Sequence, residues 1–179
     1  SNIAIKGATT GTGTFTIESP ATNTDRSLTL PDGAGTLDRL ERTGNVIQVV
    51  GANDILTATN TNSTSFTATT LAATITPTST SNKILVSATF SATQDGGSNI
   101  QSQVTIYRGT TNLRPSGTCL FMYDHAGGNV GFSGTFMFYD SPATTSATTY
   151  TVYVKVANSS SYFRAVAGTD TISLMEIAG

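Results

Sequence analysis

Threonine constrains the fold of this chain more than any other residue type. Together with serine it makes up about three in ten of the 179 residues, whereas Lys, Arg, Asp and Glu together make up 11%. Threonine is β-branched and restricted at χ1, so it fits a pleated strand better than a helix. A chain that relies on uncharged hydroxyls for solubility, and in which they alternate with short apolar runs, is predicted to be an all-β protein that acts at a surface or in a particle.

The hydrophobic pattern from residue 46 onward has a period of two, as expected for β-strands. No segment with helical spacing lies between these runs, so a parallel α/β sheet is excluded. The pattern predicts an antiparallel β-sandwich or jelly-roll head over residues 46–179. Seven or eight strands are predicted, in residues 46–50, 65–76, 83–91, 100–107, 120–123, 130–139, 150–156 and 172–177.

In most of these strands one face is predicted to point into the core. The residues on these faces are Ile84, Val86, Ala88, Phe90, Ile100, Val104, Ile106, Val130, Phe132, Phe136, Phe138, Tyr150, Val152, Val154 and Val156. Two segments differ from this rule. Residues 46–50 are predicted to form a strand that is covered on both faces. The Thr-rich residues 65–76 are predicted to form a pair of weak strands that ends at Pro77.

Residues 1–37 form a separate strip with its own short alternating runs. Phe15 and Ile17 share one face of the first run, and Leu28 and Leu30 share one face of the second. These four apolar side chains are too few to stabilise a unit of this length. We therefore predict that they serve trimer formation or docking, against other copies of the strip, the next domain or another surface.

Residues 38–45 are predicted to connect the strip to the head. The segment 36–44 is the one helical candidate, because Thr36 is a suitable N-cap and Gly44 a suitable C-terminal residue. One or two turns are the most that this length allows.

Charge and cysteine content exclude several classes of protein. The net charge is −2 and the pI is near 5.1, so no basic surface is expected to bind nucleic acid. Cys119 is the single cysteine, which excludes an intrachain disulfide and favours folding in a reducing cytosol. The chain shows no signal-peptide pattern and no apolar run near the ~20 residues that cross a bilayer, so no membrane insertion is expected.

No catalytic, cofactor or metal site is predicted, and the chain is expected not to be an enzyme. His125 is the single histidine and precedes a Gly-rich loop, where an ordinary loop role is expected. The more specific alternative is a metal ion on the axis of a trimer, held by the His125 side chains of its three copies. Three glutamates, and aspartates that mostly lie in turn sequences, give no carboxylate pair for glycoside hydrolysis.

Glu176 is the one carboxylate that the alternation places on an apolar face. It shares that face with Ile172 and Leu174. Because an unpaired buried carboxylate is costly, Glu176 is predicted to need a partner, unless the strand bulges or frays there. The candidate partners are Arg108, Arg114 and Arg164.

Aromatic and charged residues near the strand ends are candidates for contact with a receptor. Such side chains stack on sugars or proteins and give a large contact area at low entropic cost. The candidate receptor-facing residues are Tyr107, Arg108, Tyr123, His125, Tyr162 and Arg164.

The N-terminal strip resembles a module found near the start of bacteriophage fibre proteins of the short tail-fibre or head-fibre type. The resemblance lies in GTFTI at 13–17 and in SLTLPDGAGTL at 27–37. The rest of the chain looks like the β-rich head that accompanies this module. The similar segments of the head are residues 75–79, 83–86, 148–153 and 174–177.

The resemblance implies a homotrimeric fibre or spike of the virion, located on the tail or capsid surface and synthesised in the host cytoplasm. The strip would attach to phage tail or capsid proteins, and the head would serve decoration or adhesion to a glycan or protein of the host surface. Two alternatives remain open, a capsid decoration (cement) protein and a non-catalytic carbohydrate-binding β-sandwich module. A small glycan hydrolase ranks last.

Overall fold

The contacts within the chain divide it into two units, Ser1–Leu37 and Asp38–Gly179. The four predicted docking side chains, Phe15, Ile17, Leu28 and Leu30, lie outside the described residues. The computed structural model describes residues 10–14, 16, 18, 21–25, 27, 40–54, 60–95, 100–115, 120–124, 128–158, 162–165 and 170–179.

The second unit is built from β-strands, and the described residues contain no helix. All pairings between its strands are antiparallel. The strands of the described residues are β1 (Val46–Asp54), β2 (Asn60–Thr61), β3 (Thr67–Ile75), β4 (Lys83–Asp95), β5 (Ile100–Arg108), β6 (Thr111–Asn112), β7 (Leu120–Asp124), β8 (Val130–Asp140), β9 (Thr148–Val156), β10 (Tyr162–Ala165) and β11 (Asp170–Ile177).

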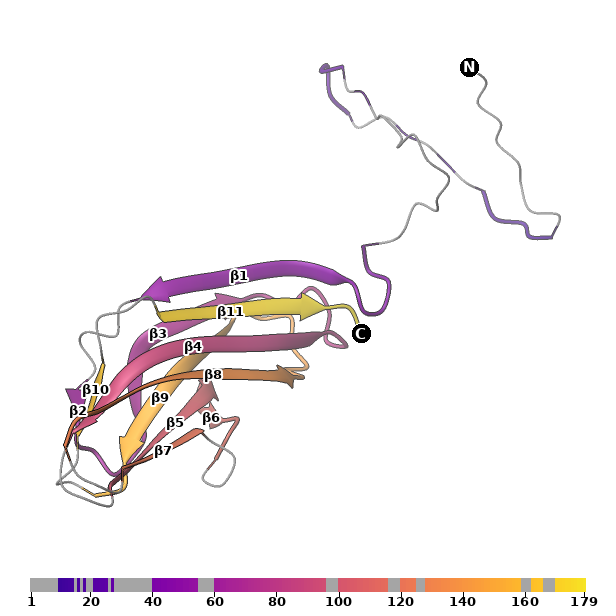
Figure 1. The fold of residues 1–179 in the computed structure, drawn as a ribbon. Coiled ribbons are helices and arrows are strands. Elements are labelled where there is room, and N and C mark those ends of the chain that lie inside the picture. Colours follow the sequence, from indigo (N-terminus) through magenta and orange to yellow (C-terminus); the bar gives the residue numbers. More distant parts are fainter. Residues whose placement is uncertain are drawn as a thin grey trace. The chain divides into compact units, whose positions relative to one another are not determined.

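One sheet, here called sheet A, has the order β1–β11–β4–β8 (Figure 1). β8 pairs with β4 along Ile84–Gln94, so β11 and β10 must share the other edge of β4. β10 therefore continues the position of β11, and the two-residue β2 pairs with β10. Sheet A is thus four positions wide.

The other sheet, sheet B, has the order β3–β9–β5, and both β7 and β6 pair with the remaining edge of β5. It is also four positions wide. The two sheets form the layers of a β-sandwich, with sheet A in front of sheet B in Figure 1. The prediction of an all-β, antiparallel fold is confirmed.

The core lies between the sheets and is formed mostly by the faces that the alternation predicts, although Val130, at the start of β8, is exposed and not part of the core as predicted. Ile84, Val86, Ala88 and Phe90 of β4 are fully buried, and the inward residues of β9 are buried in the same way. Burial of each large apolar side chain stabilises the fold by roughly 1.5–3 kcal/mol. This core holds the strand ends, and with them the polar groups described below, in fixed positions.

Two predictions about individual strands are wrong. Residues 46–50 are covered on one face only, because β1 lies at the edge of sheet A and Val46 and Val49 point away from the core. Residues 65–76 form one strand, β3, and not a pair of strands. An irregularity in its register between Ala68 and Ala72 takes up the weak alternation of this Thr-rich segment.

The predicted helix at 36–44 is wrong in its described part, since residues 40–44 form turns. The amide of Gly44 donates to the carbonyl of Ala178, and the amide of Ala178 donates to the carbonyl of Asn45, both at 2.9 Å. Gly44 has φ = 90°, a conformation that glycine adopts easily. Pairing with the backbone that follows β11 replaces the short helix, which would be marginal by itself.

Candidate functional site

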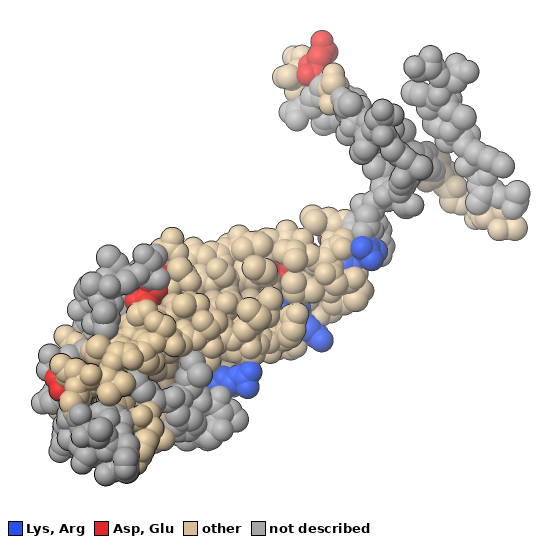
Figure 2. Space-filling view, in the orientation of Figure 1, with Lys and Arg blue, Asp and Glu red and all other residues tan. Residues whose placement is uncertain are grey.

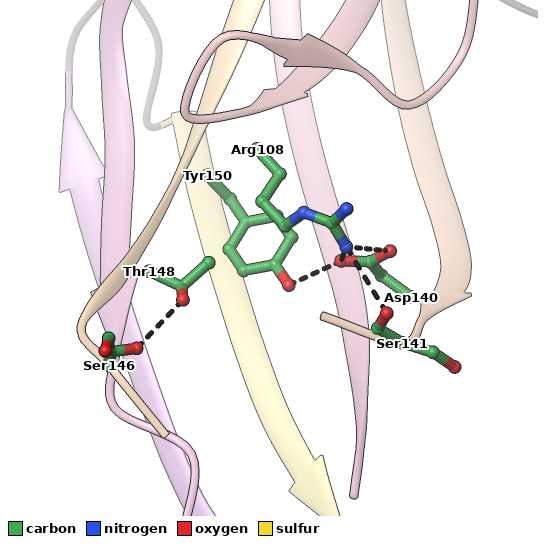
Figure 3. Close-up of polar contacts among 6 residues, drawn as sticks. All are labelled: Arg108, Asp140, Ser141, Ser146, Thr148 and Tyr150. Carbon is green, nitrogen blue, oxygen red and sulfur yellow. Dashed lines mark hydrogen bonds and ion pairs between the residues drawn. The ribbon is translucent and has the colours of Figure 1, made fainter. Parts of the chain in front are cut away.

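A polar cluster closes one end of the sandwich, and it contains the predicted receptor-facing residue Arg108 (Figure 3). Nη1 of Arg108, at the end of β5, donates to Oδ1 and Oδ2 of Asp140, at the end of β8, both at 2.8 Å. The hydroxyl of Tyr150 from β9 donates to Oδ2 of Asp140 at 2.7 Å. The cluster therefore links sheet B to sheet A.

The electrostatics of this cluster favour a structural role. Burial, followed by the hydrogen bond and negative charge of Asp140, raises the pKa of Tyr150 far above its ordinary value of 10.0. Tyr150 therefore remains a neutral donor to Asp140, which also pairs with Arg108. Because the charge of Arg108 is used within the fold, this side chain is less available to a receptor than the sequence suggested.

The loop between β8 and β9 lies beside this cluster (Figure 3). Nη1 of Arg108 also lies 3.5 Å from the carbonyl of Ser141, and the hydroxyl of Thr148 donates to the carbonyl of Ser146 at 2.9 Å. These contacts hold both ends of the loop. Asp140 was predicted only as a turn residue, although its even spacing from the inward residues Phe136 and Phe138 already placed it on the core face.

Glu176 is fully buried at the same end of the sandwich, and neutral groups surround its carboxylate. Oε2 accepts from Nε2 of Gln48 at 2.5 Å. Oε1 accepts from the amide and hydroxyl of Thr78 at 2.6 and 2.9 Å, and from Nδ2 of Asn82 at 2.7 Å. The carboxylate thus joins β1, the β3–β4 turn and β11.

The described partners of Glu176 within the chain are neutral, and neither Arg108 nor Arg114 is among them; the side chain of Arg164 lies outside the described residues. Arg108 pairs with Asp140, and the guanidinium of Arg114 lies 4.6 Å from the centre of the Phe138 ring. Burial tends to raise the pKa of Glu176, but the hydrogen bonds from Asn82, Gln48 and Thr78 together outweigh it and lower this pKa. The ionised form is therefore the one that the fold stabilises.

A small hollow of about 230 Å³ lies next to Thr78 and Asn82. Its wall also includes Glu41, Ile47, Ser79, Ser81 and Gly179. Pockets for small ligands usually measure about 300–1,000 Å³ and are mostly apolar. This hollow is smaller and polar, so we assign no ligand to it.

Aromatic side chains gather on the outer face of sheet B. The rings of Tyr107 and Tyr153 stack with their centres 4.0 Å apart, and the Phe66 ring meets Tyr107 edge-on at 6.2 Å. Nζ of Lys155 lies 4.7 Å from the centre of the Phe66 ring. Tyr107, predicted to face a receptor, is half-buried within this cluster.

The remaining receptor candidates are not brought together with this cluster by any described contact. Tyr123 is exposed on β7. Tyr162 and Arg164 belong to β10, where their backbones pair with Asp95 and Thr93 of β4. His125 lies outside the described residues.

The described ranges contain no group of three or more His, Cys, Asp or Glu side chains arranged to hold a metal ion. In the same ranges no helix is long and apolar enough to span a membrane. A scan of the chain against models of protein families gives no match, and a search among curated proteins gives no significantly similar sequence. What the chain does is therefore inferred from its own residues and geometry.

Proposed function

We propose that the chain is a structural virion protein, a homotrimeric phage fibre or spike. One observation carries this proposal: the chain divides after Leu37 into a unit that contains the fibre-like motif at 13–37 and an all-β second unit. The first unit would attach to tail or capsid proteins. The second would serve decoration or adhesion at the host surface, in a virion assembled from chains made in the host cytoplasm.

The strand order supports a jelly-roll assignment for the head. Taken along the chain, the eight main strands are β1, β3, β4, β5, β7, β8, β9 and β11. The first pairs with the last (β1–β11), the second with the seventh (β3–β9), the third with the sixth (β4–β8) and the fourth with the fifth (β5–β7). Pairing from the outside inward, divided between two sheets, is the order of a rolled-up jelly roll, a fold used by capsid and lectin domains.

Two features support the proposal, one in the head and one in the N-terminal strip. Asp140 and Glu176, the carboxylates of the polar clusters, are held by contacts that stabilise the fold. The strip supports the trimer, because its four apolar side chains have too little surface for a stable single-chain unit, and burial around a common axis would yield about 25 cal/mol per Å².

Negative-stain electron microscopy of the purified full chain tests the proposal. The expected class averages show three heads around one axis with a thin projection from one end. Averages that show single heads at micromolar concentration would overturn the trimer and with it the spike.

A non-catalytic carbohydrate-binding module is the second candidate, and the aromatic cluster of Phe66, Tyr107 and Tyr153 favours it. Aromatic rings on a sandwich face can stack on sugars. This candidate predicts a monomer that binds a glycan array and loses binding when Tyr107→Ala and Tyr153→Ala are combined. A capsid decoration protein belongs to the same class as the spike and would differ in its position on the particle.

A further inference from the structure

The outer face of sheet A carries an apolar row that crosses all four of its strands. The register places Val49 of β1 beside Met175 of β11, Met175 beside Leu85 of β4, and Leu85 beside Tyr139 of β8. Met137 lies one step further along β8 on the same face. The exposed fractions of Val49, Tyr139 and Met137 are 57%, 66% and 67%, so these are open apolar side chains.

The rest of this face is rich in hydroxyl groups, and two pairs of them bond across β4 and β8. Thr89 and Thr135 lie 3.0 Å apart across β4 and β8, and Ser91 and Ser133 are also 3.0 Å apart. Such paired hydroxyls need less water than single ones, so this part of the face is also readily desolvated.

Charge is nearly absent from the face. On β4, the outward-facing charged residues among those described are Lys83 and Asp95, which lie at the two ends of the strand. Figure 2 shows the surface over β11, β4 and β8 almost entirely in tan. An open apolar face that carries charges only at its ends is unusual for a monomeric protein, because charged residues normally protect such surfaces from association.

The size of the face matches that of a stable interface. Four strands spaced about 4.8 Å apart are roughly 19 Å wide, and ten residues are roughly 34 Å long, which gives about 650 Å² in projection. A standard interface buries about 800 Å² on each partner, and the corrugated surface of side chains exceeds its projection.

We infer that the outer face of sheet A is the surface through which copies of this chain associate. This inference rests on the proposed homotrimer and assigns its contact surface in the head. Lys83 and Asp95 lie at the two ends of β4, so a partner with charge over the middle of the face would meet no complementary group there and would leave its own charge buried. Between these two ends, a second copy of the same face presents mainly apolar and hydroxyl groups, so both surfaces can lose water there without that penalty.

The width of the face suits three copies around an axis. Three faces, each roughly 19 Å wide and closed into a triangular prism, stand about 5.5 Å from the common axis, close to half of the ~10 Å between packed sheets. One layer of side chains from each copy fills that space. At each corner β1 of one copy meets β8 of the next, which brings Val49 toward Tyr139 of the neighbouring copy and closes the ring.

Charge substitutions in the full chain test the inference. Met137→Glu combined with Tyr139→Glu places two carboxylates at outward positions, where the monomer fold tolerates them. The matched control, Ala68→Glu with Thr70→Glu, places two carboxylates at exposed positions of β3 in sheet B. Light scattering is expected to give a trimer for the wild type and the control, and at least a tenfold weaker association for the sheet A variant.

The outcomes separate this inference from the proposed function. A sheet A variant that remains trimeric overturns the assigned surface and leaves the trimer to the N-terminal strip. A wild type that is a monomer overturns both. A wild-type dimer that dissociates in the sheet A variant supports the surface and overturns the number of copies.

Cross-linking provides a second measurement that does not depend on disrupting the assembly. In a Cys119→Ser background, Val49→Cys and Tyr139→Cys are combined in one full-length chain and treated with a short bismaleimide. Covalent dimers and trimers are expected on a denaturing gel, while Ala68→Cys with Thr70→Cys gives none. A sheet A double-cysteine chain that stays monomeric on the gel overturns the inference.

Discussion

The head holds two carboxylates at one end of its core, and it stabilises them in different ways. The register places both beside Ile84, with Glu176 on one side and Asp140 on the other. Asp140 meets a positive charge from Arg108, whereas Glu176 meets neutral donors from three segments of the chain. A buried carboxylate thus requires either one counter-charge or several well-placed neutral donors.

The two clusters also differ in what they join. The Asp140 cluster bridges the two sheets, and the Glu176 cluster ties β1 and the β3–β4 turn to the last strand. Both clusters therefore fix the end of the head where residues 44 and 45 pair with Ala178.

The largest effect is expected for Glu176→Ala. It leaves the donors of Gln48, Thr78 and Asn82 without their acceptor, and each buried unpaired donor costs roughly 1–3 kcal/mol. Urea denaturation at fixed protein concentration should show a loss of about 3–5 kcal/mol in the free energy of unfolding. Glu176→Gln, which keeps one acceptor oxygen, should lose about half as much. A loss below 1 kcal/mol for Glu176→Ala would show that water replaces the carboxylate and that the cluster is not a structural one.

A smaller loss is expected for the Asp140 cluster, because it is partly open to solvent. Asp140→Ala should lower the free energy of unfolding by about 2–3 kcal/mol, since both Arg108 and Tyr150 lose their partner. Arg108→Ala should cost about 1 kcal/mol, because a partly exposed ion pair is screened by water and Asp140 retains its bond from Tyr150. Equal losses for Arg108→Ala and Asp140→Ala would contradict the assigned contacts.

Acid should weaken the Glu176 cluster in a defined direction. The pKa of Glu176 lies below its ordinary value of 4.5 in the folded chain, so its contribution is fully present above pH 4.5 and is lost as the pH falls through the folded pKa. Thermal denaturation from pH 7 to pH 3 should therefore show a decrease that is smaller in Glu176→Gln. Identical pH profiles for the two proteins would disprove the ionised state of Glu176.

High pH should weaken the Asp140 cluster, whereas low pH should weaken the Glu176 cluster. The raised pKa of Tyr150 means that its contribution is present below pH 10.0 and decreases as the pH rises above that value. Stability should fall less steeply above pH 10.0 in Tyr150→Phe than in the wild type. Parallel curves would indicate that Tyr150 ionises as easily in the folded chain as in the unfolded one.

The smallest effect is expected on the outer face of sheet B, where the aromatic side chains pack against one another. Tyr107 and Tyr153 stack on each other, and the double-mutant cycle of their alanine variants should give a coupling of about 0.5–1.5 kcal/mol in the free energy of unfolding. Oligomeric mass should not change. A coupling near zero, or a loss of the oligomer, would place a partner contact on sheet B and remove the difference between the two faces.

The sequence predicts most of the core-facing side chains, because apolar residues that alternate with a period of two indicate which side of a strand is buried. Phe90 and Val152 are examples, and Glu176 could be recognised as inward by the same rule. Its partners could not be recognised, since they lie 94 to 128 positions away and include a backbone amide. The exposure of Val49 was missed because a short apolar run does not distinguish an edge strand from a central one.

The candidate sites show the same limit. Asp140 was predicted as a turn residue, and Arg108 as a receptor-facing residue or a partner of Glu176, because the sequence does not show that two strand ends from different sheets meet. The apolar row from Val49 to Tyr139 depends on the register of four strands, which alternation alone does not fix.

The mass of the full chain in solution tests the central claim most directly. Light scattering across micromolar concentrations should give three times 18.5 kDa, with no smaller species, if the chain is a trimeric spike. A stable particle of 18.5 kDa over the same range would contradict the trimer, and with it both the proposed function and the contact surface on sheet A.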